Sequence, residues 1–417
     1  MIPSRAPERR TLRMALVAAT LAAGPLSAQA TPQPARGPGS LPPRPAVTGV
    51  HFSARHDFRV DTIAFFDHPW SIAWLPSGDM LVTERPGRLR IVREGKLLQE
   101  PVAGVPKVYR DRGQGGLMEV VPHPDFATNH LLYLSYARPT PNDTTASNAI
   151  VRGRLEGDRL VDVQEILVAN GAHQRNNQFA GKMLFDASGY LYLAVGDRQF
   201  PPQLMEKHPA QDLTNDFGTI VRLHDDGRIP ADNPFVGRTD VPHEIWSWGH
   251  RNAQGFTMNP ATGELWETEH GPRGGDELNL VLPARNYGWP LVSYGVDYDG
   301  KSFTGEIHRD GMESPRWVWI PSIAASGLAF YTGERFPWWK GSLFSGGLEG
   351  QVLVRMTIEG HEVRTTESLL IGEVGRIRDV RQGPDGLLYL AIDPQGNAAT
   401  PVVRLVPVAG DVLPPPR

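Results

Sequence analysis

The chain has 417 residues, and its 42 Lys and Arg against 46 Asp and Glu give a formal net charge of −4. This near balance excludes the strongly basic surface that binding to nucleic acids or anionic membranes requires. The absence of cysteine excludes disulfides and thiolate metal sites. The 44 glycines and 38 prolines favour many short strands over long helices.

The N-terminal segment has the features of an export signal. Arg9 and Arg10 precede an apolar run over 14–23, and a group of small residues ends at Ala30. This order predicts a signal peptide over 1–30, cleaved after Ala30, and a periplasmic mature protein. The apolar run is too short to span a bilayer.

A pattern of two short strands joined by a turn recurs along the rest of the chain. Each copy has an apolar strand, a turn with Pro, Asp or Gly, and a second, alternating strand. The six copies lie at 71–84, 118–136, 182–197, 255–268, 327–345 and 379–392. Repeats at this spacing predict an all-β fold, a six-bladed β-propeller of four-stranded antiparallel sheets.

The propeller is expected to be one domain over 56–410, after a flexible Pro- and Gly-rich lead-in at 31–55 and before a C-terminal tail at 411–417. The last strand, 400–406, has no partner after it. We expect it to pair with 59–66, which closes the ring and removes an open edge. Two separate β domains would need a linker in the middle of the chain, and the sequence contains none.

Three unusual loops lie within residues 244–300. The first contains Arg251 and Asn252, the second is Gly-rich over 269–277, and the third is an aromatic turn over 286–290. The Gly-rich loop can turn its backbone carbonyls toward a hard cation, which prefers oxygen ligands. Each loop alone is typical of a turn, but together they predict the rim of a ligand site.

Two arginines near the C-terminus extend this predicted site. Arg376 and Arg378 alternate by two, so on an extended strand both side chains point the same way. With Arg251 they would form a cluster of three cations able to grip a polycarboxylate. The alternative is an ordinary surface pair bound to Asp379 and its neighbours.

Six uncommon motifs occur in a characteristic order. They are GQGGL at Gly113, HPDF at His123, GHRN at Gly249, EHGPRGGDE at Glu269, NYGWP at Asn286 and RIRDV at Arg376. From His68 to Leu405 the chain therefore resembles the soluble PQQ-dependent aldose sugar dehydrogenases, the glucose/sorbosone dehydrogenase family. By this resemblance, the quinone would be bound by Gln114, Arg251, Asn252, Arg376 and Arg378. The carbonyls of Gly271 and Pro272 would bind calcium.

Two positions depart from that family. Gln178 stands where the family has its catalytic histidine, and a primary amide cannot take up a substrate proton near neutral pH. The aspartate that supports this base in the family is present as Asp197. Glu349 stands where the family has a lysine that contacts the quinone, so the charge there is reversed.

Asp197, assisted by His173, is therefore the predicted proton acceptor, and a solvated loop position is the alternative for His173. His250 and His270 in the rim loops are further candidates. His123 is expected to be a structural turn residue.

The predicted function is a periplasmic quinoprotein that oxidises the C1 hydroxyl of aldoses to lactones with PQQ and calcium. It would pass electrons to an external acceptor, and Gln178 would lower its rate. One alternative is a propeller that kept a calcium-supported pocket but binds a sugar or metabolite, or acts as a lyase or hydrolase. A scaffold for protein partners is supported only by the fold.

Overall fold

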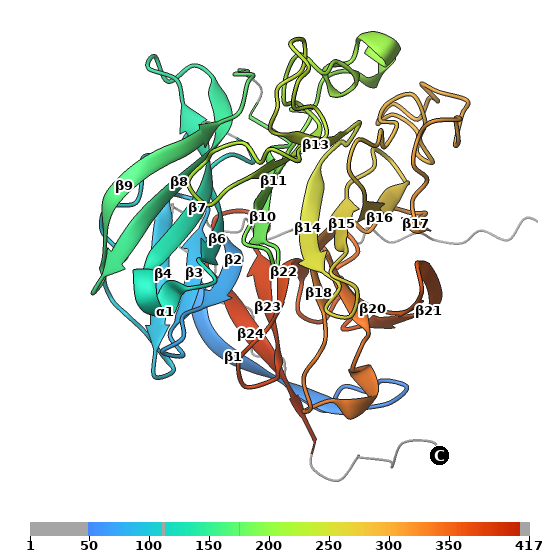
Figure 1. Cartoon of the computed structure of the whole chain (residues 1–417). Helices are drawn as coiled ribbons and strands as arrows, with labels where there is room; N and C mark the ends of the chain where they lie inside the picture. Colours follow the sequence, from blue (N-terminus) through green and yellow to red (C-terminus); the bar gives the residue numbers. More distant parts are fainter. Residues whose placement is uncertain (1–48, 111–112, 175, 409–417) are drawn as a thin grey trace, which may run out of the picture. The chain divides into compact units, whose positions relative to one another are not determined.

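The computed structural model describes residues 49–110, 113–174 and 176–408 and contains six four-stranded antiparallel sheets arranged as blades in a ring (Figure 1). This confirms the predicted six-bladed β-propeller. The predicted signal peptide, most of the lead-in and the C-terminal tail lie outside the described residues.

The blades follow the order of the chain. Blade 1 comprises β2 (Pro69–Trp74), β3 (Met80–Glu84), β4 (Arg88–Arg93) and β5 (Lys96–Leu97); blade 2 comprises β6 (Leu117–Pro122), β7 (Leu131–Pro139), β8 (Ala146–Glu156) and β9 (Arg159–Val168). Blade 3 comprises β10 (Ala180–Phe185), β11 (Leu191–Val195), β12 (Thr219–Leu223) and β13 (Ile245–Trp248); blade 4 comprises β14 (Ala253–Met258), β15 (Leu265–Glu269), β16 (Asp276–Val281) and β17 (Trp317–Trp319). Blade 5 comprises β18 (Ala325–Phe330), β19 (Leu343–Gly347), β20 (Val352–Glu359) and β21 (Glu362–Leu369); blade 6 comprises β22 (Arg376–Gln382), β23 (Leu388–Asp393), β24 (Thr400–Pro407) and β1 (Phe58–Phe66).

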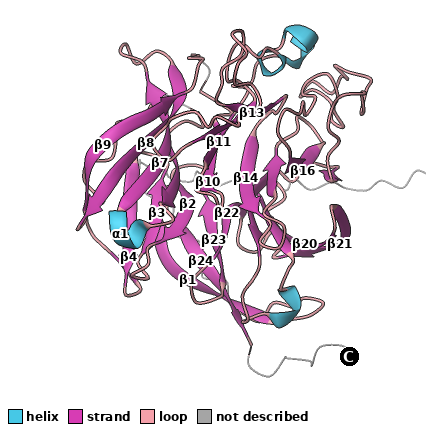
Figure 2. Ribbon diagram, in the orientation of Figure 1, coloured by secondary structure: helices cyan, strands magenta, loops and turns pink. Residues whose placement is uncertain are grey.

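Helical structure among the described residues is limited to short pieces in the connections (Figure 2). They are α1 (Phe126–Asn129) and the 3₁₀ segments η1 (Pro202–Lys207), η2 (Pro209–Gln211) and η3 (Pro337–Trp339). None of the helices in this part of the chain is long and apolar enough to cross a membrane.

In three blades the turn between the first two strands depends on glycine. Gly78, Gly189 and Gly386 occupy the same place in three repeats, and their φ angles are 89°, 81° and 74°. This left-handed region suits glycine because a Cβ atom would be strained there. In these three blades the recurring Gly is therefore the residue that lets the pair of strands fold back, whereas in blade 2 the left-handed position is taken by His130, with a φ of 56°.

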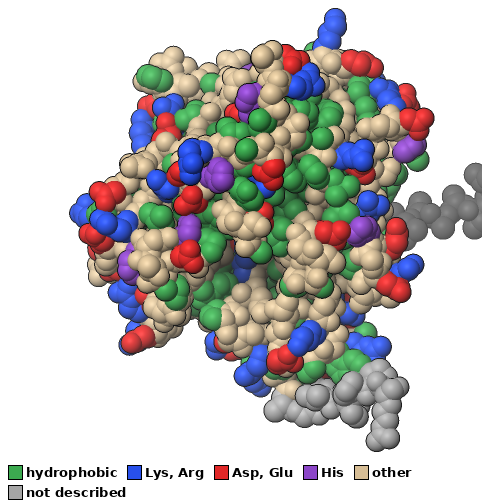
Figure 3. Space-filling view, in the orientation of Figure 1, with side chains coloured by type: hydrophobic (Ala, Val, Ile, Leu, Met, Phe, Trp, Pro, Cys, Tyr) green, Lys and Arg blue, Asp and Glu red, His purple; other side chains and the backbone are tan. Residues whose placement is uncertain are grey.

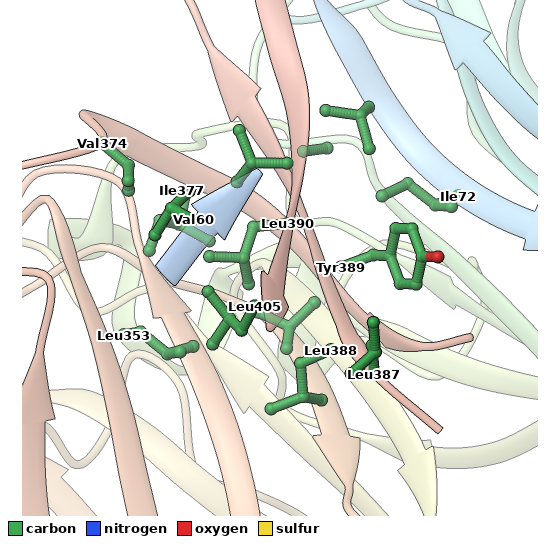
Figure 4. Packing of buried hydrophobic residues seen from close by; sticks show 14 of the residues in the cluster. Val60, Ile72, Leu353, Val374, Ile377, Leu387, Leu388, Tyr389, Leu390 and Leu405 are labelled. Carbon is green, nitrogen blue, oxygen red and sulfur yellow. The ribbon is translucent and has the colours of Figure 1, made fainter. Parts of the chain in front are cut away.

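The ring is closed in blade 6 by strands from the two ends of the described chain. β24 pairs antiparallel with β1, with Val60 opposite Leu405, which confirms the predicted closure. Figure 4 shows Val60, Ile377, Leu390 and Leu405 in one buried apolar cluster. Because β24 lies between β1 and β23, closure leaves it with a partner on both sides.

The first strands of blades 1 to 5, together with β22, line the centre of the ring. Each of these inner strands contacts the next one around the ring, in the order β2, β6, β10, β14, β18 and β22, and β22 in turn contacts β2. Residues that are remote in sequence therefore meet where these inner strands begin. The face seen in Figure 3 carries Lys and Arg interspersed with Asp and Glu, in keeping with the balanced composition.

Candidate functional site

Two adjoining pockets are lined by every predicted site residue except His173 and His250. The larger, of about 710 Å³, is lined by Gln114, Asn252, Gly271, Pro272, Glu349, Arg376 and Arg378 among others. The smaller, of about 210 Å³, is lined by Gln178, Asp197 and Arg251. Pro272 and Tyr298 line both pockets and mark where they meet.

Arg376 and Arg378 point the same way, toward one shared carboxylate. Arg376 Nε lies 3.6 Å and Arg378 Nη2 3.3 Å from Asp393 Oδ2, at the end of the neighbouring strand. Arg378 Nη1 also donates to Gln254 Oε1 at 2.7 Å. The alternative pairing with Asp379 is not what the structure shows, because Asp379 is bound by other cations (below).

Arg85 and Arg273 are two further cations of the larger pocket that the sequence reasoning missed. Burial lowers the pKa of Arg85 and nearby Arg378 acts in the same direction, whereas Asp393 opposes them. Arg85 directly follows β3, as His270 follows β15 and Leu348 follows β19, and all three line this pocket. Superposing the six sequence repeats would have pointed to this position.

The larger pocket suits a ligand with several carboxylates. Two buried guanidinium nitrogens, Arg85 Nε and Arg378 Nε, have no hydrogen-bond partner among the described residues. A buried donor without a partner is costly, so a ligand acceptor would relieve it. Asp393 offsets part of the cationic charge but leaves these donors available.

Glu349 lies at the rim of the larger pocket. Its Oε2 is 3.3 Å from Arg376 Nη1, and 75% of its side-chain surface is exposed. Its backbone N–H donates to Ile323 O at 2.9 Å. The carboxylate therefore faces Arg376 from the solvent side, where water weakens its electrostatic effect.

Gln178 bridges two opposite charges in the smaller pocket. With the amide assigned from its neighbours, its nitrogen donates to Asp197 Oδ1 and its oxygen accepts from Arg251 Nη2 at 2.9 Å. Its backbone N–H donates to Gln114 Oε1 at 2.8 Å, and its φ is 49°. Backbone and side chain are thus both held, in a conformation that non-glycine residues seldom adopt.

Asp197 is fully buried, and each of its oxygens accepts further hydrogen bonds. Oδ2 accepts from Trp289 Nε1 and Oδ1 from the N–H of Gln199, both at 2.8 Å. Burial raises the pKa of Asp197 to about 6, although Arg251 acts to lower it. At neutral pH the group is a carboxylate whose proton affinity lies close to the working range of a general base.

His208 is a second buried group beside Asp197 that the sequence did not single out. Its Nε2 lies 3.7 Å from Asp197 Oδ2, and burial lowers the pKa of His208 to about 4. It is therefore neutral near pH 7. Its position before η2 gives no pattern from which sequence reasoning could have found it.

Arg251 lies apart from the arginine pair that the sequence placed it with. Its Nη1 donates to the carbonyls of His270 and Gly271, both at 2.8 Å, and its guanidinium lies 5.1 Å from the Trp289 ring. It lines the smaller pocket, whereas Arg85 joins the pair in the larger one. Arg251 thus binds the carbonyls of two residues, His270 and Gly271, that line the larger pocket.

The loop expected to bind calcium is held in place by a hydrogen bond to the side chain of Asp276. Gly271 N–H donates to Asp276 Oδ1 at 2.9 Å, and Asp276 Oδ2 accepts from Ala325 N–H at 3.1 Å. Gly271 O already accepts from Arg251, but a carbonyl oxygen has a second lone pair for a cation. The donor set is thus compatible with calcium and shares one oxygen with an arginine.

The buried carboxylates of Glu267 and Glu269 lie next to the loop that contains Arg251. Glu269 Oε2 accepts from the backbone N–H groups of Arg251 at 2.5 Å and Asn252 at 3.2 Å. His250 Nδ1 lies 2.8 Å from Glu267 Oε1. Burial opposes the charge on His250, but Glu267 and Glu269 raise its pKa to about 9. His250 is therefore a buried cation of the scaffold, not a proton acceptor.

The other histidines fall into different roles. His173 pairs through its backbone with Ala146, and its ring lies 4.5 Å from that of Phe200. It does not line either pocket.

His270 lines the larger pocket, and burial with nearby Arg378 lowers its pKa to about 3. His123 Nδ1 accepts from Asp125 N–H at 2.9 Å, the expected turn role.

The chain belongs to the glucose/sorbosone dehydrogenase family, since the Glucose / Sorbosone dehydrogenase family model matches residues 66–403. Aldose sugar dehydrogenase YliI of Escherichia coli is 43% identical over 333 residues, covering 78% of this chain and 87% of that protein. A crystal structure of glucose dehydrogenase superposes with a TM-score of 0.78 at 44% identity, over 83% of this chain and 99% of the other. The PQQ-bound aldose sugar dehydrogenase from Streptomyces coelicolor has a TM-score of 0.65 at 25% identity, over 84% and 98%.

Proposed function

We propose that this protein is a PQQ- and calcium-dependent dehydrogenase that oxidises the C1 hydroxyl of aldose sugars to lactones. The observation that carries the proposal is the larger pocket, in which Arg85, Arg376 and Arg378 surround a space of about 710 Å³. PQQ carries three carboxyl groups, and arginine is suited to bind them in pairs of hydrogen bonds. When bound, the quinone supplies the acceptor for hydride, and calcium polarises it.

The sugar would occupy the smaller pocket. Trp289 and Phe200 offer apolar ring surface there, and Gln199, Gln203 and Asp297 offer hydrogen-bonding groups. A few polar groups set in an apolar wall are typical of small-molecule sites. Because the two pockets meet at Pro272 and Tyr298, a sugar would lie beside the cofactor.

The proton of the C1 hydroxyl would pass to Asp197. This carboxylate is already held by the Gln178 amide, Trp289 Nε1 and Gln199 N–H. A substrate hydroxyl must therefore replace the Gln178 donor at Oδ1 or reach the carboxylate through one water. We expect a functional enzyme with a reduced turnover number for this reason.

Calcium would bind to the carbonyls of Gly271 and Pro272, next to Arg251. Export is part of the same proposal: the signal peptide over 1–30 would be removed after Ala30, and the mature enzyme would work in the periplasm with an external electron acceptor. The N-terminal mass of protein recovered from the periplasm tests this part, because a chain starting at Met1 is incompatible with it.

The test of the proposed function is a titration of the purified protein with PQQ in calcium, followed by absorbance, together with a dye-linked assay on aldoses. Binding and sugar-dependent dye reduction are expected, and Arg378→Gln should weaken binding at least tenfold because it removes one charged donor. Arg364→Gln, on the exposed outer strand β21, is the matched control. No binding at millimolar calcium would rule the proposal out.

A second candidate is a propeller that binds a sugar or metabolite without quinone chemistry. The bridge that Gln178 forms between Asp197 and Arg251 favours it, because that bridge occupies the groups a base would use. Sugar binding that is independent of PQQ, with no dye reduction, would support this candidate.

A further inference from the structure

A closed ring of four charged side chains lies next to the candidate site. Lys182 Nζ is 2.8 Å from Asp379 Oδ1 and 3.1 Å from Glu119 Oε2. Arg381 completes the ring, with Nε 3.0 Å from Asp379 Oδ2 and Nη2 2.7 Å from Glu119 Oε1. Two cations and two anions leave no net charge.

Three of the four groups are almost completely buried. The side chains of Lys182 and Glu119 are 1% exposed and that of Asp379 is 0% exposed, whereas Arg381 is 23% exposed. Removing one partner from a buried ion pair leaves an uncompensated charge, which is far more costly than losing a surface pair. Burial acts to raise the pKa of Asp379, but Arg381 and Lys182 hold it below its ordinary value.

The ring joins blade 6 to blades 2 and 3, which contact each other through β6 and β10. Lys182 is on β10 of blade 3, Glu119 on β6 of blade 2, and Asp379 and Arg381 on β22 of blade 6. Blade 1 is attached through Ser71, whose hydroxyl donates to Glu119, and through Ile72 N–H, which donates to Asp379 Oδ2 at 3.0 Å. Figure 1 draws β2, β10 and β22 near the middle of the ring of sheets.

Each of these strands also carries a wall of the pockets. Asp379 directly follows Arg378, and the register of β22 shifts between Ile377 and Asp379. Lys182 follows Gln178 and Phe179, which line the pockets, and its Nζ lies 4.3 Å from the ring of Trp70, which lines the larger one. The ring thus fixes the strand segments next to the arginine pair, Gln178 and Trp70.

We propose that Lys182, acting through Asp379 and Glu119, is a positioning residue that holds the arginine pair of β22 and the Gln178 segment of β10 in the geometry that binds the cofactor. The inference takes its ligand, PQQ, from the proposed function. The ring of four charged side chains is observed in the structure and does not depend on that function. A purely structural role for Lys182 would change stability without changing the affinity of the folded protein.

The test compares Lys182→Met with Lys340→Met, which removes an exposed lysine paired with Glu334. We expect Lys182→Met to raise the Kd for PQQ in calcium roughly tenfold, as is usual for changes in a coupled network. Lys340→Met should leave the Kd unchanged. Lys182→Arg, and Lys182→Met combined with Glu119→Gln, keep the ring neutral and should restore the Kd to within about threefold of wild type.

Hydrogen exchange of the peptide over 376–382 gives a second readout that needs no cofactor. Faster exchange in Lys182→Met but not in Lys340→Met would show that the ring holds β22, even if the wild type binds no PQQ and the proposed function fails. Faster exchange with wild-type affinity would leave Lys182 a purely structural role and overturns the inference. Wild-type exchange with wild-type affinity in Lys182→Met overturns it. A neutral double variant as weak as Lys182→Met also overturns it, because packing and not charge balance would then be the cause. If Lys182→Met does not fold, the neutral double variant and Lys182→Arg replace it. Their Kd for PQQ and the hydrogen exchange of their peptide over 376–382 then test the inference.

Discussion

At the scale of single residues, Gln178 decides how fast a proton can leave the substrate. It donates to Asp197 and accepts from Arg251, but it cannot itself carry a proton away. An imidazole in its place would lie between the same two groups, with Asp197 to orient it. We expect Gln178→His to raise kcat on aldoses at least ~100-fold with PQQ and calcium saturating.

The measurement is a dye-linked assay of wild type, Gln178→His and a control, Asn177→His, which adds the same ring one position away. A wild type already as fast as Gln178→His would show that Asp197 takes the proton without help. Asp197→Asn would then be the inactive variant.

The charge of Glu349 affects cofactor affinity less than its sequence position suggests. Its contact with Arg376 is real, at 3.3 Å, but three-quarters of the side chain is exposed. Solvent screening limits such a pair to a fraction of its buried value. We expect Glu349→Lys to tighten PQQ binding about tenfold, as measured by titration. Glu359→Lys, at the exposed end of β20, should have no effect.

The buried carboxylate of Asp197 makes stability depend on pH. Its pKa is about 6 in the folded protein, above the unfolded value of about 4. The folded state therefore holds the proton more tightly, and this stabilisation is complete below pH 4 and lost as pH rises through 6. Relative to Asp197→Asn, wild type should lose about 3 kcal/mol between pH 4 and pH 7.

Urea unfolding of both proteins at several pH values measures this difference. Asp310→Asn, which alters a fully exposed carboxylate, should give a flat difference over the same range. A flat difference for Asp197→Asn as well would mean that the folded protein binds the proton no more tightly than the unfolded chain does.

At the scale of secondary-structure elements, β24 holds the two ends of the propeller together. Val403 on β24 is 2% exposed and lies between Thr62 of β1 and Leu390 of β23. Proline there removes a ladder hydrogen bond in the middle of a sheet, so Val403→Pro should lower the free energy of unfolding by about 3 kcal/mol or more. The control is Val163→Pro, at an irregular point of the outer strand β9. Equal stabilities would contradict a closing role for β24.

The strands were predictable because each blade repeats the same local pattern. An apolar strand, a turn and an alternating strand are specified within a short local stretch of the chain, so sequence alone located the first two strands of every blade. The pocket positions of Arg376 and Arg378 followed from strand alternation in the same way. The bond of Arg251 to Gly271 O, the bridge through Gln178 and the burial of Lys182 depend on tertiary contacts between loops and between blades. Sequence spacing carries no information about such contacts.

At the scale of the whole molecule, the propeller places two groups of charged residues at adjoining pockets. Arg85, Arg376 and Arg378 line the larger pocket, and Arg251 with Asp197 lines the smaller one. Pro272 lines both pockets, and Asp276 ties the preceding residue, Gly271, to blade 5 through Ala325. A cation bound to this loop would therefore be linked to several blades at once.

Calcium should for this reason stabilise the whole fold. A ligand that binds only the folded state adds RT ln(1 + [L]/Kd), about 2.7 kcal/mol at a hundredfold excess over Kd, and carbonyl oxygens suit calcium better than the smaller, more strongly hydrated magnesium. We expect calcium to raise the melting temperature of chelator-treated protein and equal magnesium to raise it less. Asp276→Asn should reduce the calcium shift, because it weakens the anchor of Gly271. A melting temperature that does not change at millimolar calcium would contradict the site, and an unchanged shift in Asp276→Asn would place the ion elsewhere in the molecule.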